Sequence, residues 1–278
     1  MKKPLLLPNI ITAFSLSCGL FVIFKMSSYP PNDVSYEAVL SAVAILILAA
    51  FLDVLDGALA RAMKIESDFG GFFDSLSDAV SFGVAPSVVI LKAISLEPKT
   101  AVSFFLIIGA MIYSISGVLR LVRFTVAKQR IQGNEEEMKA AKANFTGLPI
   151  PAGACVVLST TLFLMSDDGR EFISLQKEGQ AIVAAAAFFV VGYFMISRWK
   201  FPSIKALRIR VSSFQVVFVT AILAGAILLS ALHHFAITLF VLSCVYLLVA
   251  WTLSLVRVIS GKRLQALEDF DPEPEEDN

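Results

Sequence analysis

Residues 36–78, YEAVLSAVAILILAAFLDVLDGALARAMKIESDFGGFFDSLSD, decide the fold of this chain. The stretch begins as an apolar run long enough to cross a bilayer. Apolar residues also surround four acids further along it, Asp53, Asp56, Asp74 and Asp78. A carboxylate at membrane depth costs roughly 2.5–3.5 kcal/mol on insertion scales, so ionisable residues there indicate a functional site. These acids therefore predict chemistry inside a membrane helix.

The composition of the whole chain predicts an all-α, polytopic transmembrane helical bundle. Of its 278 residues, 57% are apolar and 17% are charged, whereas about a quarter are charged in soluble domains. A helix needs about 20 residues to cross about 30 Å of hydrocarbon, and its backbone polar groups are then paired internally. About eight stretches qualify, near 9–26, 36–62, 70–95, 101–127, 149–166, 180–197, 213–232 and 235–258. Pro86 predicts a kink in the third of them.

The distribution of basic residues predicts the orientation in the membrane. If the N-terminus is cytoplasmic, all but five of the 23 Lys and Arg residues face the cytoplasm. The five exceptions are Lys25, Lys92, Lys99, Arg170 and Lys177. We therefore expect an integral protein of a prokaryotic inner (cytoplasmic) membrane, with both termini and the acids on the cytoplasmic side. The expected partners are membrane lipids and no nucleic acid.

The first two acids share one helix face with small and basic residues. Positions 53, 56, 57, 60 and 61 are spaced i, i+3, i+4, i+7 and i+8, which is a single face of an α-helix. Gly57 and Ala60 remove side-chain bulk there, so a flat and rigid group can lie close to the backbone. Arg61, one turn further on, suits a phosphate oxygen.

Asp74 and Asp78 lie one turn apart on the next helix, which is entered through Gly70. Two antiparallel helices joined by a turn over 62–69 would bring all four acids together. Carboxylates that close repel one another and cannot all stay ionised without a cation. Oxygen ligands without His or Cys favour Mg²⁺ or Mn²⁺, and four acids can bridge two such ions, which suits displacement at phosphorus. The residues predict phosphoryl-type transfer at the membrane surface.

The complete pattern is Asp53-x2-Asp56-Gly57-x2-Ala60-Arg61-x8-Gly70-x3-Asp74-x3-Asp78. At every position it resembles the signature of the CDP-alcohol phosphatidyltransferases, membrane enzymes that move a phosphatidyl or phospho-alcohol group from a CDP-linked donor to an alcohol. The resemblance implies that the four aspartates hold two divalent cations, Mg²⁺ or Mn²⁺. It also implies that Asp78 is the catalytic base that takes the acceptor's hydroxyl proton. The CDP site that it implies, including the N-terminal Pro8-Asn9-x2-Thr12 motif, comprises Asn9, Thr12, Asp53, Gly57, Ala60, Arg61 and Gly70.

Four further segments narrow the resemblance: SDAVSFGVAP at 77–86, LRLVRF at 119–124, FTGLPIP at 145–151 and FPSIK at 201–205. They resemble the membrane-type bacterial and archaeal phosphatidylserine synthases. That resemblance implies transfer of the phosphatidyl group from CDP-diacylglycerol to L-serine, giving phosphatidylserine and CMP. Arg120, Arg123 and Lys142 are candidates for binding the serine carboxylate or a lipid phosphate, the alternative being that they snorkel to headgroups.

The resemblance also organises the chain. It implies a six-helix catalytic core over 1–205, two additional C-terminal transmembrane helices over 206–260 and an acidic disordered tail over 261–278. Other acceptors stay open, namely glycerol 3-phosphate, inositol phosphate and choline, as does a homodimer. A cation transporter is the alternative from another class, and it would spread acids across the membrane depth.

Overall fold

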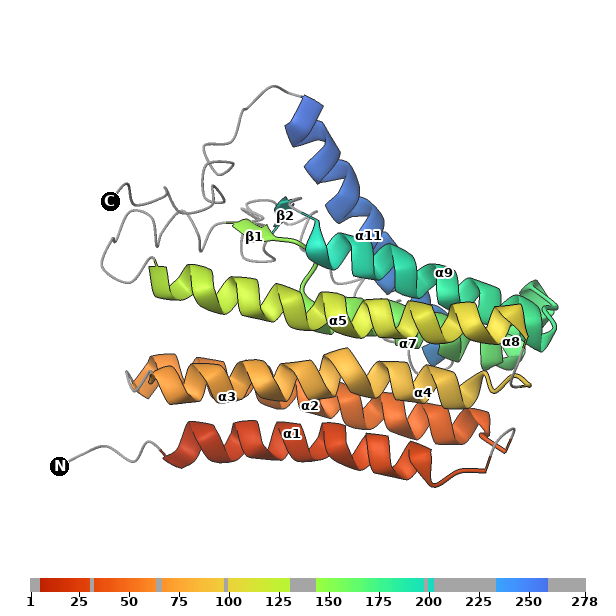
Figure 1. The fold of residues 1–278 in the computed structure, drawn as a ribbon, viewed down its shortest axis with the longest axis horizontal. Coiled ribbons are helices and arrows are strands. Elements are labelled where there is room, and N and C mark those ends of the chain that lie inside the picture. Colours follow the sequence, from red (N-terminus) through yellow and green to blue (C-terminus); the bar gives the residue numbers. More distant parts are fainter. Residues whose placement is uncertain are drawn as a thin grey trace, which may run out of the picture.

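The computed structural model describes residues 6–30, 33–63, 67–97, 100–130, 144–197, 200–202 and 234–259. The N-terminal half contains α1 (Leu6–Ser27), α2 (Tyr36–Met63), α3 (Asp68–Asp78), the π-helical turn η1 (Ala79–Val84), α4 (Ala85–Ala93) and α5 (Ala101–Arg130). The remainder contains β1 (Asn144–Thr146), α7 (Ile150–Met165), α8 (Asp167–Phe172), α9 (Lys177–Ile196), β2 (Lys200–Pro202) and α11 (Phe235–Ile259). Figure 1 shows the long helices side by side as a bundle.

The long helices confirm a polytopic all-α membrane protein. Six of them are long and apolar enough to cross a bilayer: Leu7–Ser27, Tyr36–Met63, Phe69–Ala93, Ala101–Val126, Lys177–Ile196 and Phe235–Thr252. They correspond to six of the eight predicted spans. The predicted span at 149–166 is the shorter apolar helix α7, and the one at 213–232 lies outside the described residues.

The helix α7 is short and is surrounded by protein. It has 16 residues, and nearly all of them are buried. Its neighbours include α9, α11, α4 and α2. Its hydroxyl side chains donate to carbonyls of their own helix, Ser159 and Thr160 to Val156 and Thr161 to Val157. The buried hydroxyls of these three residues therefore all have hydrogen-bond partners, as an apolar environment requires.

The helix α1 connects the second and third spans through polar contacts. The Ser15 hydroxyl donates to the Ala49 carbonyl of α2 at 3.0 Å. Ser77 and Ser81 donate to carbonyls of α1 at 3.4 Å and 3.3 Å. The start of α1, the end of α2 and the start of α3 consequently lie at the same end of the bundle (Figure 1).

Where Pro86 predicts a kink, the structure has a widened turn. The span Phe69–Ala93 is continuous, but its middle is the π-helical turn η1, which ends just before Pro86. In an α-helix the carbonyl of Phe82 would accept from the N–H of residue 86, and proline has none. The Tyr113 hydroxyl of α5 donates to this carbonyl instead, at 2.6 Å. A π-helical turn of this kind often marks a functional site.

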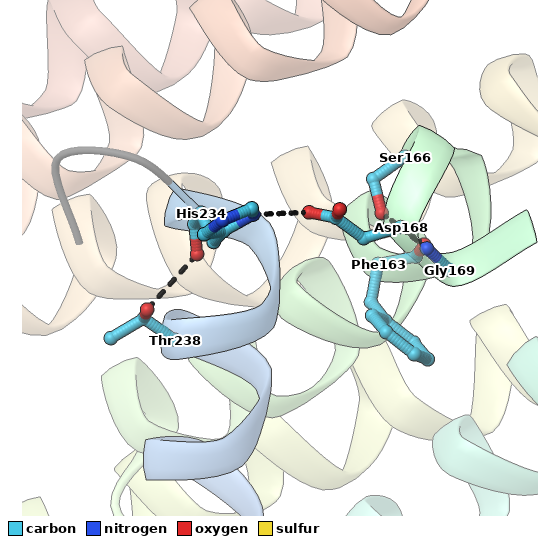
Figure 2. A network of polar contacts seen from close by, with 6 residues as sticks. All are labelled: Phe163, Ser166, Asp168, Gly169, His234 and Thr238. Carbon is cyan, nitrogen blue, oxygen red and sulfur yellow. Dashed lines mark hydrogen bonds and ion pairs between the residues drawn. The ribbon is translucent and has the colours of Figure 1, made fainter. Parts of the chain in front are cut away.

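At the opposite end of the bundle, polar contacts connect α8 to α11 (Figure 2). The Ser166 hydroxyl caps α8, since it accepts from the Gly169 N–H at 3.0 Å. The same first turn of α8 presents Asp168, whose Oδ2 lies 2.9 Å from Nδ1 of His234, the residue just before α11. Both side chains are partly exposed, and exposed pairs contribute at most about 1 kcal/mol. The pair connects α8 to the residue before α11 and adds little to the stability of the fold.

We expect Gly19→Ala to destabilise the bundle. A Cβ at Gly19 would lie 2.8 Å from Cα of Ser81, so α1 and η1 would have to separate. Overpacking of this kind costs about 1–3 kcal/mol, which thermal unfolding in detergent would detect as a lower midpoint. Gly71→Ala is the matched control, because a Cβ there meets nothing within 4 Å. Equal midpoints for the two variants would contradict the close contact.

Candidate active site

Asp53 and Asp56 are carried near the end of α2, three residues apart on one face. Asp56 is 3% exposed, and the hydroxyl of Thr12 on α1 donates to its Oδ2 at 2.5 Å. The predicted N-terminal motif therefore lies beside the aspartates. In this structure Thr12 contacts a carboxylate, which fixes the direction in which Asp56 points.

The third span brings the other two acids to the same place. One ligand oxygen from each of Asp53, Asp56 and Asp74 lies within 4.8 Å of the other two. The Asp53 carboxyl is also close enough to Asp78 and Asp74 for hydrogen bonding. The spacing of the acids within α2 and α3 thus brings all four predicted aspartates together.

This cluster suits a hard divalent cation. All of its donors are carboxylate oxygens, which is the ligand type that Mg²⁺ and Mn²⁺ prefer. Oδ1 of Asp78 is buried and has no hydrogen-bond partner within the described part of the chain. A buried carboxylate oxygen without a donor is costly unless a cation or a substrate proton meets it.

The small residues of α2 make room for a side chain of the same helix. A Cβ at Gly57 would lie 3.3 Å from Nη1 of Arg61, so the guanidinium folds back over this glycine. Arg61 is exposed and Ala60 is partly buried. The space predicted for a flat ligand is thus partly covered by Arg61 in this structure.

The start of α3 meets α1 at Gly70. A Cβ there would lie 3.3 Å from Oδ1 of Asn9, which places the predicted Asn9 against the entry of the third span. The Ser67 hydroxyl caps α3 by accepting from the Gly70 N–H at 3.0 Å. Ser67 was not among the predicted residues, although a serine just before a helix is a standard N-cap pattern.

Arg120 reaches into the bundle from α5. It is 9% exposed, so it does not snorkel to the membrane surface. Its charge interacts with Asp78 and with Tyr246 of α11. Its Nε has no hydrogen-bond partner among the residues that the structure describes. A buried guanidinium next to the acids is thus able to bind an anionic group. Tyr246, from the last described helix, is a neighbour that the sequence analysis did not identify.

Arg123 is also on α5, near Arg120, and it contacts the end of α9. Its Nη1 donates to the Ile196 carbonyl at 3.0 Å, beside Gly147, which has a φ of +80°. Arginine near a helix C-terminus satisfies carbonyls that have no partner within the helix. The structure thus gives Arg123 a contact with the backbone, and Lys142 lies outside the described residues.

Two of the quoted sequence segments pair with each other. β1 and β2 form an antiparallel ribbon in which Phe145 faces Phe201. The Leu148 N–H then donates to the Phe194 carbonyl at 3.0 Å, which ties the ribbon to the end of α9. The all-α prediction omitted this ribbon because three-residue strands leave no periodic pattern.

Comparison with known protein families matches residues 5–197 to the CDP-alcohol phosphatidyltransferases. The chain belongs to this family. The matched region contains all four aspartates and every described residue of the predicted CDP site.

Several relatives share one name, CDP-diacylglycerol–serine O-phosphatidyltransferase. The protein of Helicobacter pylori is 29% identical over 265 residues, covering 94% of this chain and 97% of the relative. That of Bacillus subtilis is 32% identical over 200 residues, covering 72% and 91%. That of the archaeon Methanocaldococcus jannaschii is 26% identical over 246 residues, covering 88% and 94%.

We expect Thr12→Val to lower the turnover of this phosphatidyltransferase at least about tenfold, because a displaced catalytic group has effects of this size. The substitution keeps the shape and removes the hydroxyl that holds Asp56. Release of CMP from CDP-diacylglycerol by the purified protein is the measurement. Thr12→Ser keeps the donor and should stay close to the unmodified enzyme; an equal loss in both variants would contradict the orienting role.

Proposed function

We propose that this protein transfers the phosphatidyl group of CDP-diacylglycerol to the hydroxyl of L-serine, giving phosphatidylserine and CMP. The convergence of Asp53, Asp56 and Asp74 within 4.8 Å carries the proposal, with the partnerless oxygen of Asp78 beside them. The shared name of the relatives supports serine as the acceptor. Membership of the family supports the CDP-linked donor.

The four aspartates would hold two divalent cations, Mg²⁺ or Mn²⁺, which when bound neutralise the diphosphate and make CMP a better leaving group. Thr12 keeps Asp56 directed at the cluster. Asn9, Gly57, Ala60, Arg61 and Gly70 would line the nucleotide site, as the signature implies. Substrate entry would then require Arg61 to move off Gly57, and its guanidinium would contact a phosphate oxygen.

The reaction needs a base and an acceptor site. Asp78 would take the proton of the serine hydroxyl through its buried Oδ1 as the serine oxygen attacks the β-phosphorus, which carries diacylglycerol. The bond from that phosphorus to the bridging oxygen breaks, and CMP leaves with the electron pair. Arg120, buried and facing Asp78, would bind the serine carboxylate. Arg123 is a weaker candidate because it already contacts the Ile196 carbonyl.

We place the reaction at the cytoplasmic face of an inner membrane, with both termini on that side. Support comes from the bias of Lys and Arg along the sequence and from the end of the bundle at which the acid-bearing helices meet. We also propose that residues 1–205 form the catalytic core and that 206–260 add two helices to it.

Serine should be the preferred acceptor. Purified protein would be supplied with CDP-diacylglycerol and, separately, with radiolabelled serine, glycerol 3-phosphate, inositol phosphate or choline. Lipid-soluble label should come predominantly from serine, since Arg120 offers one buried guanidinium for one carboxylate. Predominant labelling from another acceptor would refute the serine assignment and leave the family membership intact.

Asp78→Asn should reduce turnover roughly 10²-fold or more, the usual contribution of general-base catalysis, in a protein that still folds. Removal of divalent cations with a chelator should abolish activity reversibly. The measurement is serine-dependent CMP release, with elution from a sizing column as the test of folding. The matched control is Asp33→Asn, an exposed residue outside the spans. Normal activity of the Asp78 variant, or of the chelated enzyme, would be incompatible with this mechanism.

A further inference from the structure

The π-helical turn η1 begins directly after Asp78. Asp78 is the residue that precedes the turn, and Ala79–Val84 form it. The turn is closed by the Ala85 N–H, which donates to the carbonyl of Val80, five residues back. The backbone direction of the proposed base is therefore set at the junction between an α-helix and a wider turn.

Oδ1 of Asp78 has no hydrogen-bond partner among the residues that the structure describes. The carboxyl of Asp78 is within hydrogen-bonding reach of Asp53, so the position of Oδ1 depends on that contact and on the backbone. The other acids nearby repel it, and Arg120 attracts it. Small changes in the turn would therefore move this oxygen relative to an acceptor hydroxyl.

Two hydroxyls of α5 donate hydrogen bonds to carbonyls at the end of the turn. The Tyr113 hydroxyl donates to the Phe82 carbonyl at 2.6 Å, and the Ser114 hydroxyl donates to the Gly83 carbonyl at 2.9 Å. Tyr113 is fully buried, and its ring centroid lies 5.3 Å from that of Phe188. Because Pro86 supplies no N–H to the Phe82 carbonyl, Tyr113 provides the donor that the helix itself lacks.

The opposite side of the turn is fixed by α1. The Ser81 hydroxyl donates to the Ser15 carbonyl at 3.3 Å, and Gly19 allows the two backbones to approach closely. The turn is thus held between α1 and α5, and the carbonyls of Phe82 and Gly83 accept its hydrogen bonds from α5.

We propose that Tyr113 is a positioning residue for the transfer reaction: by donating to the carbonyl that Pro86 leaves without a helical donor, it keeps η1 widened and Asp78 aimed at the acceptor. This inference rests on the proposed role of Asp78. Tyr113 touches no substrate. It acts through the Phe82 carbonyl, so its removal affects catalysis more than binding.

The test is Tyr113→Phe, which keeps the ring against Phe188 and removes only the hydroxyl. We expect kcat to fall about tenfold, the scale of effect from a slightly displaced catalytic group, while KM for CDP-diacylglycerol and for serine stays within about twofold. The increase in unfolding midpoint on adding CDP with Mn²⁺ should persist, because nucleotide binding does not pass through Tyr113. Tyr193→Phe is the matched control, since Tyr193 is 60% exposed on α9.

The effect of Tyr113→Phe on kcat in a Pro86→Ala background gives a second measurement. Pro86→Ala restores an N–H for the Phe82 carbonyl, so in that background Tyr113→Phe should change kcat by less than about twofold; effects of groups that share one partner are not additive. If the Pro86→Ala protein does not fold, Ser114→Ala serves instead and should also lower kcat with little change in KM.

The outcomes separate this inference from the proposed function. If the unmodified protein and the Tyr193 variant release CMP with serine while Tyr113→Phe matches them in kcat, the positioning role is wrong and the function stands. An equal loss of kcat and of CDP-induced stabilisation in Tyr113→Phe would also overturn it, since that pattern indicates general damage to the fold. If the unmodified protein does not release CMP in response to serine, the proposed function itself fails.

Discussion

Mutual repulsion among carboxylates is the constraint on which this structure depends. Asp53, Asp56 and Asp74 approach within 4.8 Å of one another in a helical bundle with a lipid-facing exterior. Within a membrane helix each such acid carries an insertion cost of a few kcal/mol. The fold concentrates that cost at one end of three helices, where a divalent cation and the phosphates of a nucleotide would compensate it.

The rest of the N-terminal half supports that cluster through hydroxyl groups. Thr12 donates to Asp56, Ser15 to a carbonyl of α2, and Ser77 and Ser81 to carbonyls of α1. Helices in lipid gain no hydrophobic driving force from meeting each other, so hydrogen bonds and close packing between helices set their separation. The helix α1 is thus the element that fixes the second and third spans at the distance that the acids need.

The acids, their helices and their convergence could be predicted because helix geometry fixes them. Intervals of three and four residues place Asp53 with Asp56, and Asp74 with Asp78, on single faces, and the short connection forces the helices to be antiparallel. Features that depend on contacts across the bundle could not be predicted in this way. Nothing in the local pattern tells that Arg61 folds over Gly57, that Arg123 contacts the Ile196 carbonyl, or that Arg120 stays buried.

Pro86 shows where sequence rules stop short. Its lack of an N–H is evident from the sequence, and so is a disturbance of the helix. The form of the disturbance depends on which donor the freed carbonyl finds. The hydroxyl of Tyr113 donates to the freed Phe82 carbonyl. Because this buried acceptor has a partner, the cost of the missing helical hydrogen bond is avoided, and the helix continues through a widened turn.

The helix α11 contacts the proposed catalytic core, so the division into a core over 1–205 and two added helices over 206–260 is not a division into independent parts. The family match ends at residue 197, and the relative from Bacillus subtilis aligns over 91% of its own length with only 72% of this chain. Yet α11 packs on α7 and on β2, and its Tyr246 interacts with Arg120. Arg120 in turn interacts with Asp78. The C-terminal helix therefore contributes to the electrostatic environment of Arg120 and Asp78, while the four aspartates themselves lie in the region that matches the family.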